Sequence, residues 1–264
     1  LNMHHMVSDG WSAGIMLQEL PHFYRAYQQG LDSTLEPLAL QYSDYAYWQR
    51  RWLEEGLFDA QKAYWQQQLG DYHGVLELPV DQPRPEIQGF QGSTLRQTYP
   101  AALQTRLQAL ADSSGCTLFM VTLAAFQGLL FHYSGQRDVV VGSPVANRRL
   151  PALEPLIGFF VNTLALRTHI TKQTSFLDVL SAVRRTTLAA YENQDLPFEN
   201  LLDSLNLLRD AGHSPLVQVM FSFQKAPSTA IELPDLTLTP LDVDSRSAKF
   251  ELSLNLTVSE EGLI

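Results

Sequence analysis

The chain has 264 residues, 45% of them hydrophobic and 17% charged, which is typical of folded domains and unlike disordered, collagen-like or coiled-coil chains. At about 100–200 residues per domain, this length predicts one large domain or two small ones. The 28 Asp and Glu residues outnumber the 18 Lys and Arg residues, and the net charge is −10. Because such a chain lacks the positive field that attracts phosphate backbones, we expect no nucleic-acid partner.

Periodic apolar residues in the first part of the chain predict three helices, over residues 11–29, 41–55 and 58–69. Within the second of these, Tyr42, Tyr45 and Trp48 have helical spacing and are expected to pack in the core. Turn-forming residues then follow, rich in proline, glycine and glutamine. We therefore place a domain joint near residues 70–92.

Beyond this joint, strands and helices are expected in a mixed α/β arrangement without internal repeats. The predicted strands lie at residues 93–99, 138–146, 160–170, 216–223, 236–241 and 249–259. The predicted helices begin after Pro100, at residue 118, at residue 175 and at residue 197, and the last three end at residues 134, 194 and 205.

The cysteine content and the apolar segments bear on the compartment. Cys116 is the only cysteine, which excludes an intramolecular disulfide and a Cys-based zinc or iron–sulfur site. This composition fits a reducing cytosol, so we expect a cytoplasmic protein. The longest apolar stretch, residues 118–133, is shorter than the ~20 residues of a spanning helix and contains Gln127 and His132. We therefore expect no membrane partner.

Both ends of the sequence indicate a piece of a longer polypeptide. A dense polar motif begins at His4, and no preceding residues could wall off a reactive site there. At the other end, apolar and polar residues alternate over 250–259, which predicts a half-buried strand. Residues 259–262 predict a hairpin turn, and the return strand would begin at Leu263. We expect that an amino-terminal part and the carboxy-terminal end are missing.

The polar run at residues 3–12, MHHMVSDGWS, is the sharpest feature of the sequence. A histidine is the natural proton acceptor near neutral pH. Asp9, four residues after His5, can hold the local backbone or fix the imidazole ring. Gly10 permits a sharp turn directly after the carboxylate. The run therefore places a proton acceptor beside a tight turn.

The histidine pair has other interpretations, including a structural role or a chance metal contact. A metal site needs further His, Glu or Cys ligands, and the five other histidines show no ligand spacing, so we predict no metal. A nucleophilic triad needs an activated Ser or Cys. The chain has no Gly-x-Ser-x-Gly elbow, and Cys116 has no evident partner. A structural pair remains, or a histidine that acts on a substrate's own nucleophile.

Residues 3–12 resemble the His-His motif of condensation domains from nonribosomal peptide synthetases. Four further segments resemble later core motifs of that family, in the family's order. They are residues 42–50 (YSDYAYWQR), 157–164 (IGFFVNTL) with Arg167, 193–199 (NQDLPFE) and 209–216 (RDAGHSPL). Within the last motif, Gly-His-Ser stands where the family usually has Ser-Arg-Asn, which we interpret as a tolerated loop change.

The resemblance implies an α/β fold similar to chloramphenicol acetyltransferase, a two-lobed pseudo-dimer within one chain with mixed sheets and flanking helices, here truncated at both ends. Residues 1–92 would form the remainder of the amino-terminal lobe and the inter-lobe connection. Residues 93–264 would form an incomplete carboxy-terminal lobe. The site is expected between the lobes.

The resemblance also implies an activity and its partners. The family joins a carrier-bound acyl or peptidyl thioester to the amine of a carrier-bound aminoacyl thioester through an amide bond. The domain itself is expected to bind no cofactor, because substrates arrive on the phosphopantetheine arms of upstream and downstream peptidyl carrier domains. An adjacent adenylation domain is expected in the same polypeptide.

Residue roles follow from the same resemblance. His5 is expected to be catalytic, with His4 in support, and Gly10 to offer its backbone N–H to the oxyanion. Asp9 is expected to be structural and paired with Arg148.

Four residues are candidates for the substrate channel, namely Trp11, Ser12, Asn162 and Thr163. The wording of residues 3–12 and 157–163 resembles the class that joins an L-configured donor to an L-configured acceptor. Two alternatives stay open, a catalytically silent carrier-docking platform and a free-standing acyltransferase that uses a soluble thioester.

Overall fold

The structure is a computed structural model of the chain. It describes residues 3–32, 35–72, 74–205, 207, 211–225, 231–233, 236–239, 241, 246–259 and 261–264. The chain folds into two compact units whose segments interleave along the sequence. The first unit consists of Leu1–Ala60, Val145–Asn162 and Pro227–Asp242, and the second consists of Gln61–Pro144, Thr163–Ala226 and Val243–Ile264. The assignment of residues 1–92 and 93–264 to two lobes stays a prediction.

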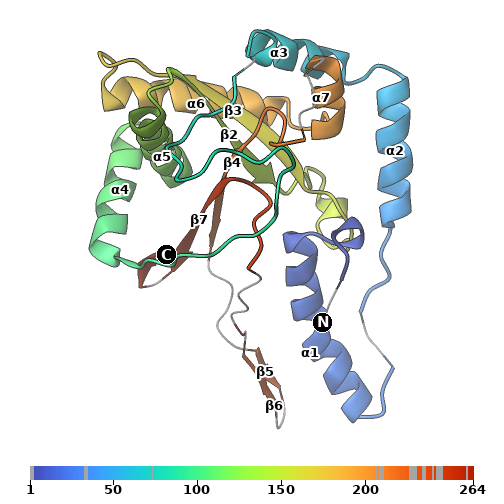
Figure 1. Cartoon of the computed structure of the whole chain (residues 1–264). Helices are drawn as coiled ribbons and strands as arrows, with labels where there is room; N and C mark the ends of the chain where they lie inside the picture. Colours follow the sequence, from blue (N-terminus) through green and yellow to red (C-terminus); the bar gives the residue numbers. More distant parts are fainter. Residues whose placement is uncertain are drawn as a thin grey trace. The chain divides into compact units, whose positions relative to one another are not determined.

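The first unit contains two long helices, two short 3-10 turns and a small hairpin (Figure 1). They are η1 (His5–Val7), α1 (Gly10–Gln28), α2 (Tyr42–Glu54), η2 (Pro151–Leu153), β5 (Ile231–Leu233) and β6 (Leu236–Leu238). A small core joins α2 to the segment that follows η2. It consists of Tyr45, Leu153, Leu156 and Phe160, with Leu40 and Tyr42 packed against it.

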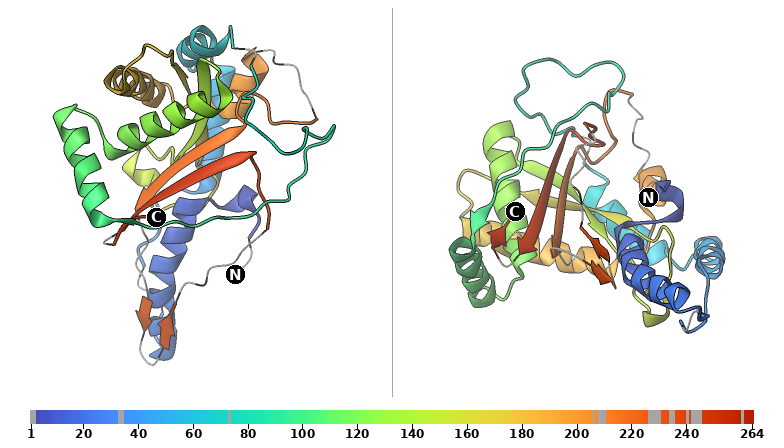
Figure 2. Two further views of the ribbon diagram at one scale, coloured as in Figure 1. Left: turned by 60° about the vertical axis from the view of Figure 1, so that its left-hand side comes forward. Right: turned by 90° about the horizontal axis from the view of Figure 1, so that it is seen from below.

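The second unit is a mixed sheet with helices. The sheet order is β1 (Tyr99–Pro100), β8 (Gly262–Leu263), β7 (Leu252–Ser259), β4 (Val219–Lys225), β2 (Asp138–Val145) and β3 (Asn162–His169). Strand β4 is parallel to both β2 and β7, whereas β8 is antiparallel to β7 and to β1. The two long strands β4 and β7 lie side by side in Figure 2.

Five helices belong to the second unit, counting only the described residues. They are α3 (Asp59–Leu69), α4 (Ala101–Ser113), α5 (Leu118–Ser134), α6 (Phe176–Glu192) and α7 (Phe198–Leu205). Helix α5 packs against both α4 and α6 and buries most of its apolar residues. Its ends follow from local chemistry, because the Thr117 side chain accepts a hydrogen bond from the Met120 N–H and Gly135 closes the helix with a φ of 69°.

The predicted helices and the carboxy-terminal hairpin are confirmed. Each helix begins and ends within two residues of its predicted bounds. Val258 pairs with Leu263 across the turn that the sequence predicts after residue 259. Tyr45 is buried, and Tyr42 and Trp48 are half-buried. The prediction did not include β5.

The strand predicted over residues 93–99 is wrong. Strand structure is confined to Tyr99–Pro100, and residues 93–98 adopt no regular structure. Leu95 is 96% exposed, so this segment has no buried face that would fix it on a sheet. Only Tyr99 and Pro100 find a partner strand, β8.

The strand predicted over 216–223 begins instead at Val219. Leu216 has a φ of 63°, in the left-handed region, and the Val217 N–H donates to the Pro215 carbonyl at 2.7 Å. This turn delays the entry of the chain into the sheet. Similarly, β7 starts at Leu252, β3 starts at Asn162 and β6 ends at Leu238. Pro240, part of the predicted strand over 236–241, lies outside the described residues, as do Arg209 and Asp210 of the last family motif.

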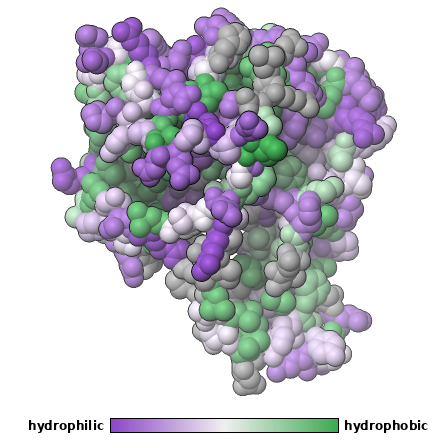
Figure 3. Space-filling view, viewed as in Figure 1, coloured by the Kyte–Doolittle hydropathy of each residue, from purple (hydrophilic) through white to green (hydrophobic). Residues whose placement is uncertain are grey.

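Two surface features of the helices complete the description. In Figure 3, hydrophobic side chains gather over the region of α1 and the β5–β6 hairpin, and Leu17, Leu20 and Phe23 of α1 are each nearly half exposed. Across the described residues, no single helix is long and apolar enough to cross a membrane. Helices α4 and α5 pass this test only as a pair, which is bent by 102°.

Candidate functional site

The histidine pair forms the short turn η1 ahead of α1. His4 Nδ1 accepts a hydrogen bond from the Met6 N–H at 3.1 Å, so the first histidine caps the turn. His5 Nδ1 lies 2.7 Å from the Ser8 carbonyl oxygen. A carbonyl oxygen only accepts, so Nδ1 carries the proton. In the neutral ring, Nε2 therefore keeps its lone pair and can accept a proton.

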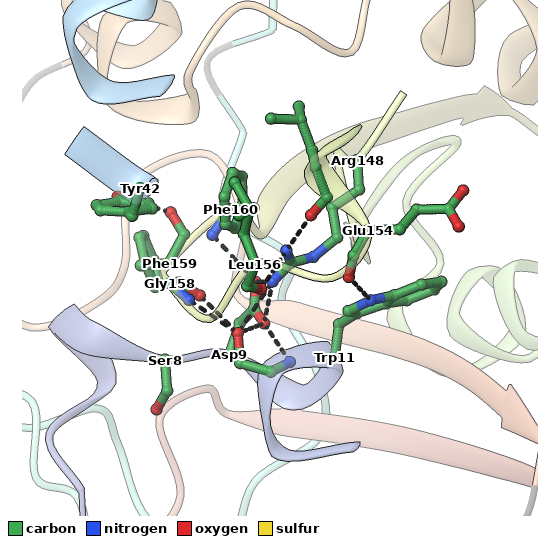
Figure 4. A network of polar contacts seen from close by, with 12 residues as sticks. Ser8, Asp9, Trp11, Tyr42, Arg148, Glu154, Leu156, Gly158, Phe159 and Phe160 are labelled. Carbon is green, nitrogen blue, oxygen red and sulfur yellow. Dashed lines mark hydrogen bonds and ion pairs between the residues drawn. The ribbon is translucent and has the colours of Figure 1, made fainter. Parts of the chain in front are cut away.

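Asp9 forms the amino-terminal cap of α1. Its Oδ1 accepts hydrogen bonds from the Ser12 N–H at 2.8 Å and from the Ser12 hydroxyl at 2.7 Å. Its Oδ2 accepts one from the Phe160 N–H at 3.0 Å. The carboxylate therefore ties the start of α1 to residues 157–160, which follow η2 (Figure 4).

Arg148 closes this network from the other side (Figure 4). Its Nη2 lies 3.0 Å from Asp9 Oδ1, and the two side chains are 1% and 2% exposed. Its Nη1 donates to the carbonyls of Leu153 and Leu156, both at 2.7 Å. The guanidinium carbon lies 4.0 Å from the centroid of the Phe160 ring. The ion pair that the sequence predicted is thus present, buried and well supplied with hydrogen bonds.

Ser12 joins every part of the network. Its hydroxyl proton lies between Asp9 Oδ1 at 2.7 Å and the Gly158 carbonyl at 2.9 Å. Its oxygen accepts from Arg148 Nη2 at 2.9 Å and from the Gly158 N–H at 3.0 Å. Ser12 is fully buried, so the structure places this channel candidate inside the ion-pair network.

The electrostatics of Asp9 argue for a permanent charge. Burial acts to raise its pKa, but the hydrogen bonds from Ser12 and Phe160 and the charge of Arg148 outweigh that effect. The pKa of Asp9 therefore lies below its ordinary value, and the group is an anion at neutral pH. A carboxylate in this state fixes structure and does not shuttle protons.

A groove lies beside the start of α1. Its volume is 560 Å³, and its walls include Gly10, Trp11 and Gly14 of α1 and Pro151 and Glu154 near η2. Trp11 also donates from Nε1 to the Glu154 carbonyl at 2.9 Å. Of the four channel candidates, Trp11 therefore lines an open space.

The other two channel candidates belong to the start of β3. Asn162 is buried and Thr163 is half-buried. Neither is among the residues that line the groove. Their contact with a substrate stays a prediction. Among the described residues, no group of three or more His, Cys, Asp or Glu side chains could hold a metal ion.

Sequence reasoning missed the residues that complete the site. Phe160 contributes a backbone N–H, and Phe159 packs its ring against His5 with 5.2 Å between centroids at an interplanar angle of 85°. Both lie in the segment 157–164, whose likeness to a family motif was the only signal. A backbone donor leaves no trace in residue type, so only the structure could identify it.

A protein-family model described as "Condensation domain" matches residues 1–264. The chain belongs to the condensation-domain family. One of the linear gramicidin synthase proteins of Brevibacillus parabrevis is 45% identical over 265 residues, which are 100% of this chain and 5% of the relative. Phosphinothricin tripeptide synthetase PhsC of Streptomyces viridochromogenes is 44% identical over 98% of this chain and 24% of its own length. The chain thus spans a small part of the synthetases it matches.

Solved structures show the same fold. The X-domain from teicoplanin biosynthesis superposes with a TM-score of 0.88 at 28% identity, over 99% of this chain and 61% of that one. The condensation domain of the Monacolin K polyketide synthase MokA gives a TM-score of 0.81 at 23% identity, over 96% and 59%. The predicted condensation-domain fold, similar to chloramphenicol acetyltransferase, is therefore confirmed.

Proposed function

We propose that this condensation domain joins two carrier-bound substrates through an amide bond. The donor is an acyl or peptidyl thioester on the phosphopantetheine arm of an upstream carrier domain. The acceptor is the free amine of an aminoacyl thioester on a downstream carrier. The family assignment and the likeness to peptide synthetases support this activity. The observation that carries it is the fixed imidazole of His5, whose Nδ1 is bound to the Ser8 carbonyl.

The reaction needs one proton transfer and one exchange of acyl group. The acceptor nitrogen attacks the thioester carbonyl, and His5 Nε2 takes a proton from that nitrogen. The C–S bond then breaks, and the upstream thiolate receives a proton, which leaves the lengthened chain on the downstream arm. Holding both reactants in line supplies about 7–11 kcal/mol of the barrier, and the proton transfer adds about 10²–10⁴-fold in rate.

The remaining residues support this step. The Gly10 N–H lies at the start of α1, where the helix dipole favours negative charge, and we assign it to the developing oxyanion. His4 caps the η1 turn and so supports the position of His5. The buried pair of Asp9 and Arg148 holds the turn and does not take part in proton transfer.

The partners and stereochemistry belong to the same proposal. The relatives are large synthetases, and one structural neighbour is a four-domain nonribosomal peptide synthetase bound to AMP and glycine. We propose carrier domains on both sides, an adenylation domain in the same polypeptide, and a cytoplasmic location. The wording of residues 3–12 and 157–163 supports an L-configured donor and an L-configured acceptor.

The test replaces His5 in the full synthetase that contains this chain, with both carriers loaded. We expect His5→Ala to lower amide formation by about 10²–10⁴-fold, while carrier loading is unchanged. His132→Ala, which removes an exposed histidine on α5, is the matched control and should condense at the wild-type rate. A His5→Ala enzyme that condenses at the wild-type rate would remove His5 from the mechanism. Donors loaded as D-isomers should react more slowly than the L-isomers.

A further inference from the structure

Tyr42 makes three contacts with three consecutive residues beside the site. Its hydroxyl donates to the Phe159 carbonyl at 2.9 Å. Its ring meets the Phe160 ring edge-on, with 5.1 Å between centroids. A Cβ built on Gly158 would overlap the Tyr42 ring, so the ring lies directly over the glycine backbone. Gly158 has no positive φ, so close approach of the ring is what requires a glycine there.

The same three residues face the histidine from their other side. The Phe159 ring packs against the His5 imidazole, with 5.2 Å between centroids. Below them, the Gly158 backbone binds the Ser12 hydroxyl and the Phe160 N–H binds Asp9. Residues 158–160 are thus clamped between Tyr42 and the ion-pair network (Figure 4).

The clamp has two unequal halves. The network of Asp9 and Ser12 holds the N–H and C=O groups of Gly158 and the N–H of Phe160. The Phe159 carbonyl is held instead by the Tyr42 hydroxyl. Since that carbonyl belongs to the residue whose ring touches His5, its orientation sets the orientation of the ring.

We propose that Tyr42 is a positioning residue for His5: it fixes the Phe159 backbone, so that the Phe159 ring holds the imidazole in its working orientation. This inference rests on the proposed amide-forming function. Burial, and the nearby charge of Asp9, raise the pKa of the Tyr42 phenol, so it remains a protonated donor at neutral pH. The fourth family motif, which the sequence explained only as packing, thereby gains a role in the reaction.

The test uses Tyr42→Phe in the full synthetase, because this change keeps the ring and removes only the hydroxyl. The donor carrier is loaded, and the acceptor is an aminoacyl pantetheine thioester at varied concentration, which separates kcat from KM. We expect kcat to fall by about tenfold and KM to stay within about twofold of wild type. In a Phe159→Ala background, Tyr42→Phe should cost less than about twofold further, because the residue it acts through is gone.

Tyr45→Phe is the matched control. Tyr45 lies in the same core and packs against Phe160, and its hydroxyl accepts hydrogen bonds from Gln49 and Asn147. This variant loses a hydroxyl from the same helix without touching the Phe159 carbonyl. It should keep kcat within about twofold of wild type.

Several results would overturn the proposal. These are an unchanged kcat in Tyr42→Phe, a loss equal to that of Tyr45→Phe, a change in KM alone, or a full loss that persists in the Phe159→Ala background. If His5→Ala abolishes condensation while Tyr42→Phe is normal, the positioning role alone falls. If the wild-type enzyme forms no amide, the proposed function falls and this inference falls with it.

Discussion

Asp9 and Arg148 are the residues on which the site depends most. Two charges taken out of water are tolerated only when hydrogen bonds replace the lost hydration. Asp9 receives such bonds from Ser12 and Phe160, and Arg148 gives them to two backbone carbonyls. Removing either charge leaves the other buried and uncompensated.

We expect Asp9→Asn in the full synthetase to destabilise this domain by about 3–5 kcal/mol, because Arg148 then lacks its counter-charge. Hydrogen exchange measured across residues 4–13 and 157–160 should become faster, and condensation should fall because His5 is misplaced. Asp32→Asn, at an exposed position in the same unit, is the control and should leave exchange unchanged. Adding Arg148→Met to Asp9→Asn should restore part of the lost protection.

The pH dependence gives an independent check on the same carboxylate. The folded pKa of Asp9 lies below the ordinary value of 3.8, so its stabilising contribution is complete above that pH. That contribution is lost as the pH falls through the folded value. Protection of residues 4–13 should therefore decline in this acid range in the wild type and depend less on pH in Asp9→Asn. Equal acid profiles, or unchanged exchange in Asp9→Asn at neutral pH, would mean that the ion pair does not hold the turn.

At the scale of elements, side chains on one helix organise a loop that is distant in sequence. Gln61 of α3 accepts hydrogen bonds at Oε1 from the N–H groups of Asp195 and Leu196, at 3.0 and 2.9 Å. Trp65 of the same helix is buried and donates to the Asn193 carbonyl at 2.8 Å. The segment 193–199 ends α6 and leads into α7, as the sequence predicts. This family motif therefore has a structural explanation within the second unit.

Gln61→Ala should loosen this connection. Two half-buried N–H groups lose their acceptor, which costs about 1–3 kcal/mol of local stability and predicts a roughly 5–100-fold rise in the exchange rates of the Asp195 and Leu196 amides. Gln67→Ala, on the exposed side of the same helix, is the matched control. If both variants exchange alike in residues 193–199, α3 does not hold this segment.

At the scale of the whole chain, local patterns predicted the helices, because apolar periodicity and caps act within a few residues. Strand partners were less accessible, since the parallel pairing of β4 with β7 joins segments about 30 residues apart and depends on the packing of both faces. The turn at Leu216 was missed because a left-handed leucine has no signature in the sequence.

The candidate site divides in the same way. His4, His5, Asp9 and Gly10 were accessible because they are adjacent, and Arg148 followed from the family resemblance. The contacts of Phe159, Phe160 and Gly158 depend on backbone groups and on ring approach, which residue types do not encode. Tyr42 was predicted to pack in the core, and the structure adds a hydroxyl directed at the Phe159 carbonyl.

The central claim is that this domain moves an acyl group from one carrier to the next. Its most direct test is a single turnover of the wild-type synthetase with an isotope-labelled donor on the upstream carrier and an aminoacyl group on the downstream carrier. Intact mass of the two carriers should show the label leaving the upstream arm and appearing as an amide on the downstream arm. A label that stays upstream, or is released as the free acid while the downstream aminoacyl group is unchanged, would contradict the account and favour a silent docking platform.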